Sequence, residues 1–154
     1  MDTSRHLPVP RREAGATLIE SLVAILIFSF GLLGLIGLQA ASIKNTAEAK
    51  YRADAAYLAN QIIGEMWADN PANLASYAHN PVGAASAPTA SASGNTKVTT
   101  WLGNINASLP GAASTKQQIT VNAGTGLVTV TICWLPSQEA TSSNFVTVAQ
   151  IAGG

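Results

Sequence analysis

Residues 15–40 form one long apolar stretch, GATLIESLVAILIFSFGLLGLIGLQA, near the start of the 154-residue chain. From Leu22 to Leu38 it contains no charged residue. As a helix it is long enough to cross, or nearly cross, a bilayer. One acid, Glu20, lies near its start, and a carboxylate costs about 2.5–3.5 kcal/mol at mid-membrane and less near an interface. Such a cost usually marks function, so the stretch predicts a protein that starts in the membrane and leaves it for a partner that satisfies the acid.

The residues before this stretch form a short charged leader, MDTSRHLPVPRREAG. In a secretory signal the small-residue cleavage site follows the apolar run, whereas here Gly15 precedes it. A cut at Gly15 would therefore remove the leader and keep the hydrophobic helix. Arg11 and Arg12 would hold the leader in the cytoplasm and leave the rest of the chain outside. No stretch after Ala41 is long and apolar enough for a second span.

A basic leader, Gly15, a small residue, Thr17-Leu18-Ile19-Glu20 and an apolar helix resemble the class III signal of type IV pilins and pseudopilins. Two further segments are more specific: GLLGLIGLQ at 31–39 and YRADAAYLANQIIGEMWADNP at 51–71. They are similar to the minor pilin family called type IV pilus modification protein, PilV. The resemblance is strong over residues 11–71 and weak beyond them.

The resemblance implies cleavage after Gly15 by a membrane prepilin peptidase, N-methylation of Ala16 as the new N-terminus, and packing of the helix into a pilus core. Most of the family has Phe where this chain has Ala16. The implied partners are other minor and major pilins, the prepilin peptidase and the inner-membrane assembly platform. The implied location is the inner membrane, as a single-pass protein with its head in the periplasm, and later the pilus at the cell surface.

Cleavage would create a free α-amino group on Ala16, with Glu20 about one helical turn further on. The macrodipole favours a negative charge there by about 0.3–1 kcal/mol. In a helical bundle, Glu20 of one subunit could pair with the Ala16 amine of a neighbour, and the resemblance implies that this pairing sets axial register. Loss of the partner would cost about 3–5 kcal/mol in a low-dielectric core. The alternative is an interfacial glutamate that snorkels to water.

Gly31, Gly34 and Gly37 recur at every third residue and form a slowly rotating small stripe on the helix. Small residues let helix backbones approach closely in a membrane. Each glycine also weakens the helix by about 1 kcal/mol against alanine. The stripe is interpreted as a packing groove for subunit assembly or as a place where the helix loosens in a filament, and simple tolerance of glycine in membrane helices is an equal alternative.

Residues 42–69 continue the helix with an apolar stripe at three- and four-residue steps, which predicts a core face. The stripe consists of Tyr51, Ala55, Leu58, Ile62 and Met66. Asn70-Pro71 ends the helix, because proline disfavours helical geometry in the preceding residue. A helix from about Thr17 to Asp69 would be roughly 80 Å long.

The rest of the chain predicts a small head. Trp101 to Leu109 suits one or two helical turns stopped by Pro110-Gly111. Strands are predicted at 118–122 and 127–134, joined by a hairpin turn, and at 145–151. In the second strand Val128, Val130, Ile132 and Trp134 share the face expected to lie on the long helix.

The predicted fold class is α+β, a pilin-like lollipop with a long N-terminal helix, half membrane-spanning and half amphipathic, packed on a small antiparallel sheet. The expected divisions are a leader (1–15), a transmembrane or pilus-core helix (16–40), an amphipathic helix of the head (41–70), a flexible linker (71–97) and a sheet head (98–154). The linker assignment follows from the composition of residues 72–96, which are rich in Ala, Ser, Pro and Gly.

Neither an enzyme nor a cofactor or metal site is expected. After removal of the leader the chain keeps one histidine, His79, and one cysteine, Cys133, too few for a zinc site or a Cys/His nucleophile. In an oxidising periplasm an odd cysteine is unpaired or pairs between chains, and a small residue on a strand is the simplest interpretation of Cys133. Trp101 and Trp134 are expected to be core anchors, and Trp67 to face solvent or a partner.

The favoured function is that of a minor type IV pilin that primes or modifies pilus assembly at the inner membrane and pilus tip, with effects on twitching motility and adhesion. The first alternative is a minor pseudopilin of a type II secretion system, which shares the leader, Glu20 and the helix. A DNA-uptake pilin would need a basic face, and no nucleic-acid partner is expected, because only Lys97 and Lys116 lie beyond the long helix. A single-span anchor for an enzyme domain fits poorly with so short a head.

Overall fold

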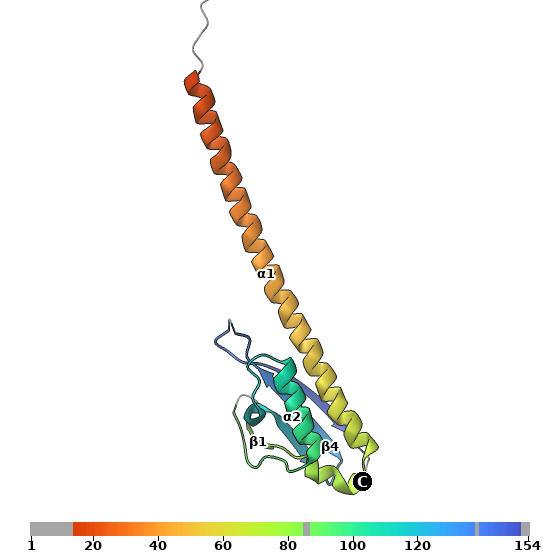
Figure 1. Ribbon diagram of the computed structural model, residues 1–154. Coiled ribbons are helices and arrows are strands. Elements are labelled where there is room, and N and C mark those ends of the chain that lie inside the picture. The colour runs from red at the N-terminus through yellow and green to blue at the C-terminus, as the bar shows by residue number, and fades with distance from the viewer. Residues whose placement is uncertain (1–13, 85–86, 138, 152–154) are drawn as a thin grey trace, which may run out of the picture. The chain divides into compact units, whose positions relative to one another are not determined.

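The computed structural model describes residues 14–84, 87–137 and 139–151. Most of the predicted leader, including Arg11 and Arg12, lies outside these residues. The chain divides into two compact units, Met1–Thr46 and Ala47–Gly154. The first described element is the long helix α1, Ala14–Ala68, which contributes to both units (Figure 1).

The second unit holds every other described element in chain order (Figure 1). These are the 3-10 helix η1 (Pro71–Tyr77), strands β1 (Val82–Ala84) and β2 (Ala87–Thr89), helix α2 (Thr96–Ser108), the 3-10 helix η2 (Ser114–Lys116), and strands β3 (Gln118–Asn122), β4 (Leu127–Trp134) and β5 (Ser143–Gln150). The fold is therefore α+β, with a long N-terminal helix followed by small antiparallel sheets, as predicted.

The part of α1 that belongs to the second unit is amphipathic, which confirms the predicted core stripe. Ala55, Leu58, Ile62 and Met66 are buried, and Tyr51 is partly buried against them. The helix ends at Ala68, just before the predicted Asn-Pro stop. The side-chain oxygen of Asn70 accepts a hydrogen bond from the backbone N–H of Ala72, so the residue that ends one helix caps the next.

The three-stranded sheet is antiparallel in the order β3-β4-β5. The predicted hairpin is confirmed, since β3 and β4 have the expected bounds. One face of β4 is fully buried: Val128, Val130, Ile132 and Trp134. These residues share a single core cluster with the buried residues of α1 and α2, so both helices cover the same face of the sheet (Figure 1).

Helix α2 is longer than the predicted one or two turns and is tied directly to α1. The side chain of Asn95 caps its N-terminus by accepting from Lys97 N. The indole N–H of Trp101 donates to the backbone oxygen of Leu58 over 2.8 Å, and Trp101 is 1% exposed. Trp101 is therefore a core anchor, as predicted.

The structure differs from the expected flexible linker over residues 71–97. Leu74 and Tyr77 of η1 and the following His79 and Asn80 are buried. His79 forms an antiparallel bridge with Ile119, which adds to the outer edge of β3. Composition pointed to a solvated segment because most of these residues are small, but a few larger side chains anchor it to the sheet.

Candidate functional site

The residues predicted to be processed lie at the start of α1. Gly15 and Ala16 belong to the first helical turn, and Glu20 follows about one turn later. All three are exposed in this single chain. The arrangement places the Ala16 backbone nitrogen and the Glu20 carboxylate near the same end of an apolar helix, while the roles assigned to these residues remain predictions.

The helix behind these residues is apolar and exposed. Among the described residues, one helix, α1, is long and apolar enough to cross a membrane, judged by length and composition alone. An 18-residue window of this helix has a mean hydropathy of 2.5, and no residue in the window is buried. The hydroxyls of Ser21 and Ser29 donate to the carbonyls of Thr17 and Ile25 over 2.9 and 2.7 Å. Such bonds within the helix would satisfy the serine hydroxyls if this segment lay in an apolar environment.

The three glycines predicted for packing lie in the uninterrupted part of α1. A Cβ built on Gly31, Gly34 or Gly37 would meet no described atom within 4 Å. Their lack of a side chain is therefore not required by any described contact within the chain. A packing role for this stripe would need a second molecule, such as the helix of a neighbouring subunit.

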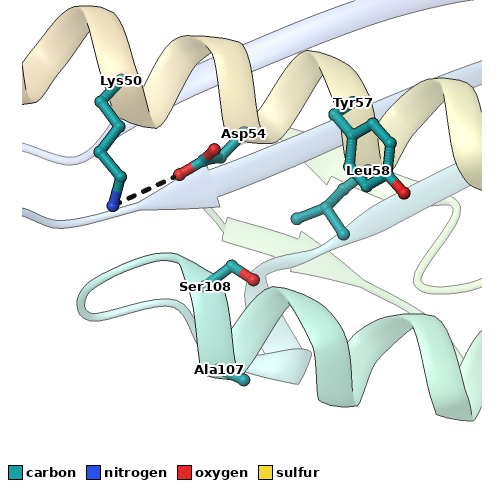
Figure 2. A pocket seen from close by; sticks show the side chains of 6 residues that line it. All are labelled: Lys50, Asp54, Tyr57, Leu58, Ala107 and Ser108. Atoms are coloured by element: carbon teal, nitrogen blue, oxygen red, sulfur yellow. Dashed lines mark ion pairs between the residues drawn. The ribbon is translucent and has the colours of Figure 1, made fainter.

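A surface groove lies in the second unit between α1 and the C-terminal end of α2 (Figure 2). Lys50, Asp54, Tyr57 and Leu58 line it from α1, opposite Ala107 and Ser108 of α2. Lys50 and Asp54 form an ion pair at 3.8 Å, and Tyr57 is 70% exposed. The groove thus presents paired charges and an aromatic side chain at the surface of the second unit.

A polar cluster around Asp69 in the head was not predicted from the sequence. The Asp69 carboxylate accepts hydrogen bonds from the Tyr77 hydroxyl (2.7 Å), the Lys97 ammonium (2.9 Å), the Asn73 amide (3.0 Å) and the Asn70 backbone N–H (2.7 Å). Tyr77, and after it Lys97, holds the pKa of the Asp69 carboxyl well below its usual range. The cluster ties the end of α1 to η1 and to the start of α2.

The pKa values of the two titratable partners of Asp69, Tyr77 and Lys97, are also shifted. Burial, and then the hydrogen bond to Asp69, raises the pKa of Tyr77 above its usual value. The bond to Asp69 also raises the pKa of Lys97. Asp69 directly precedes the Asn70-Pro71 stop that the sequence predicted. No sequence pattern indicates that Tyr77 and Lys97 contact it.

His79 is built into the head as a structural residue. Its Nδ1 accepts from the backbone N–H of Ser93 at 3.1 Å, so the other ring nitrogen carries the proton that is donated to Ser114 O at 2.9 Å. The ring thereby fastens the segment around residues 79–93 to the segment before β3. No group of three or more His, Cys, Asp or Glu side chains that could hold a metal ion occurs in the described part of the chain.

Cys133 and the tryptophans complete the set of predicted residues. Cys133 is buried in β4, where burial raises the pKa of its thiol. Its backbone N–H and oxygen both bond to the side chain of Gln117 at 2.9 Å. Trp134 is buried as predicted, whereas Trp67 is 59% exposed on α1.

Comparison with protein families identifies the N-terminal segment. Residues 10–36 match the prokaryotic N-terminal methylation motif. Neither the comparison with curated proteins nor that with solved structures gave a match. The motif covers Gly15, Ala16 and Glu20 and the first part of the apolar helix, and it implies processing by a peptidase and contact with pilin assembly machinery. The chain therefore carries the N-terminal methylation motif of type IV pilin-like and pseudopilin-like proteins, and the motif leads into a helix suited, by length and composition, to membrane anchoring.

Proposed function

We propose that this chain is a minor type IV pilin, of the type IV pilus modification protein family, that primes or modifies pilus assembly. The observation that carries the proposal is the position of Glu20: it lies one turn after Gly15 and Ala16, in an exposed apolar helix with no other charge up to Leu38. A soluble helix would not leave so much apolar surface uncovered, and a plain membrane anchor would not need the acid.

Processing makes the amine that Glu20 requires. Cleavage after Gly15 removes the first two residues of α1 together with the leader and leaves the Ala16 amine at the new helix end, where methylation keeps its positive charge. In the bilayer the Glu20 carboxylate is costly to bury. Pairing it with the Ala16 amine of a neighbouring subunit removes that cost, so assembly is favoured only in the register that brings the two charges together.

The rest of α1 supplies the apolar contact. Its exposed side chains between Leu18 and Leu38 face lipid before assembly and other pilin helices after it. Gly31, Gly34 and Gly37 provide places where a neighbouring backbone approaches closely, because no described atom of the chain occupies the space beside them. Before assembly the head lies in the periplasm, and afterwards it lies on the pilus at the cell surface.

The division of the chain follows from this function. Residues 1–15 are the leader, 16–40 the membrane or filament-core helix and 41–70 the part of the helix that carries the head. The partners are the prepilin peptidase, the inner-membrane assembly platform, and other minor and major pilins. The exposed groove at Lys50, Asp54 and Tyr57 is a surface of the head through which a neighbouring pilin is contacted.

The test is intact-mass and N-terminal sequencing of the chain produced with and without prepilin peptidase. We expect loss of Met1 to Gly15 only when the peptidase is present, with a methyl group on Ala16. A retained leader, or a cut after the apolar run, would exclude the pilin function.

Assembly is tested by Glu20→Ala, with Glu48→Ala in the head part of α1 as the matched control. We expect Glu20→Ala to be cleaved normally but to reduce surface piliation and twitching, whereas the control supports both. If deletion of the gene abolishes type II secretion and leaves pili intact, the chain is a minor pseudopilin instead.

A further inference from the structure

Strand β5 forms an edge of the three-stranded sheet, and no other described segment pairs with its outer side. Its pairing with β4 is regular over all eight residues, from Ser143 opposite Trp134 to Gln150 opposite Leu127, without a bulge. The other edge of the sheet is covered at Ile119, because His79 and Ile119 exchange both backbone hydrogen bonds beside β3, at 3.0 and 2.8 Å. The two edges of one small sheet are therefore treated differently.

The direction of the free backbone groups follows from one hydrogen bond. Ile151 N donates to Gly126 O over 2.7 Å, immediately beyond the paired strands and in the same register. Antiparallel pairs alternate between bonded and non-bonded. The odd-numbered residues of β5 therefore bond to β4, and four residues direct their backbone N–H and C=O groups outward: Asn144, Val146, Val148 and Gln150. No other described segment bonds to these backbone groups.

The edge lacks the features by which proteins usually protect a strand from pairing. Its sequence, SNFVTVAQ, has no charged residue and no proline, whereas open edges normally carry lysine, proline, a bulge or a covering segment. Val146 and Val148 are 50% and 57% exposed on the outer face. On the core side, Phe145 packs against the core cluster, but Phe145 and Thr147 are only half buried, so part of this face is also left exposed.

We propose that β5 pairs antiparallel with β5 of a second copy of this chain, centred on Thr147, to form one continuous sheet across the two heads. The register follows from the two-fold symmetry and from the alternation of the faces. It places Val146 opposite Val148 on the outer face and Phe145 opposite Ala149 on the core side, while Asn144 meets Gln150.

This register makes a second copy a better occupant than an arbitrary strand. Each residue of β5 that directs its backbone groups outward lies opposite another such residue in the second copy. Val146 can therefore exchange both backbone hydrogen bonds with Val148 of the other copy. Each apolar side chain meets an apolar one, each amide meets an amide, and no like charges are opposed. The proposal does not depend on the function proposed above, since it uses only the head.

The register gives a direct test with a single introduced cysteine. Thr147 would face its own symmetry copy in a non-hydrogen-bonded pair, where Cα atoms lie about 4.5 Å apart, within the range for a disulfide. The full chain carrying Thr147→Cys, purified in detergent, is treated with a mild oxidant and run on a non-reducing gel. We expect a disulfide-linked homodimer from this variant. The matched controls are the wild-type chain, whose Cys133 is buried, and Val82→Cys, at an exposed strand position away from β5; neither should cross-link.

A second substitution tests the pairing itself. Adding Val146→Lys to Thr147→Cys should lower the cross-linked fraction about tenfold, equivalent to about 1.4 kcal/mol, because it places a charge opposite Val148. Val82→Lys, at a similarly exposed valine, should leave the fraction unchanged.

Three results would overturn the inference. The first is cross-linking of Thr147→Cys no stronger than that of Val82→Cys in a head that is folded by circular dichroism. The second is cross-linking that Val146→Lys does not reduce. The third is a disulfide from Thr147→Cys to a different protein in place of a second copy, which would assign the edge to another partner.

Discussion

Substitution of Trp101 by phenylalanine tests how the head is attached to the long helix. The indole N–H donates to Leu58 O at 2.8 Å in a fully buried contact between α2 and α1. Phenylalanine removes this bond, a net loss of about 1 kcal/mol for a neutral pair. It also removes on the order of 40 Å² of buried ring surface, about 1 kcal/mol at 25 cal/mol/Å². Leu58 O keeps its bond within the helix, so no buried acceptor is left unsatisfied.

The expected loss is therefore about 2 kcal/mol in the free energy of unfolding of the head, or roughly 8–15 °C in Tm for a domain of this size. The assay is urea unfolding of the full chain in detergent, followed by tryptophan fluorescence, with the buried Trp134 present in every variant. Trp67→Phe is the matched control, because Trp67 is 59% exposed and should cost less than about 0.5 kcal/mol. A loss for Trp101→Phe no larger than that of the control would refute the reasoning.

Three further predictions concern stability of the head. Gly111→Ala should lower the free energy of unfolding in urea by about 2–4 kcal/mol, because Gly111 has φ +61° and a Cβ would lie 2.5 Å from Leu135 O. Its control is Gly103→Ala, which should be neutral or stabilising because the space beside Gly103 is open. Gln117→Ala should lower the free energy of unfolding by about 2–4 kcal/mol, because it removes the hydrogen bonds from Gln117 to the buried backbone N–H and C=O of Cys133. An effect equal to that of Gln150→Ala, at an exposed position, would contradict this prediction. Because the pKa of folded Asp69 is lowered, its stabilisation is present above the unfolded value and is lost as pH falls below about 4. An acid titration of unfolding should show this loss for the wild type and not for Asp69→Asn, and equal profiles would argue against it.

Periodic patterns made much of the fold predictable. The long apolar run, the stripe from Tyr51 to Met66 and the Asn70-Pro71 stop predicted α1, and alternation predicted β3 and β4 with their buried face. These features are local, because a helix or strand repeats its exposure at a fixed interval. The leader pattern around Gly15 and Glu20 was visible for the same reason, since its residues are neighbours in the chain.

The linker and the Asp69 cluster were not predictable in this way. Residues 71–97 are mostly small and carry no periodicity, yet Tyr77 and His79 anchor them by bonds to Asp69, Ser93 and Ser114. The longest of these contacts, His79 to Ser114, joins residues 35 positions apart, and nothing in the composition selects which polar groups meet. The bonds of the Gln117 side chain to Cys133 were also not predictable from the sequence; they extend the β3–β4 pairing just before the first residue of β3.

Local spacing was thus enough to specify an apolar N-terminal helix with one acid behind a leader motif, because charge, length and order along the chain are properties of neighbouring residues. Which surfaces the head leaves open depends on packing between distant segments. The chain order does not reveal that His79 pairs with β3 at Ile119, while no described segment pairs with the outer edge of β5. Nor does it reveal that Tyr57 remains exposed beside α2. Those surfaces are decided only when the helices and strands pack together around one core, because this packing determines which faces are buried and which stay exposed.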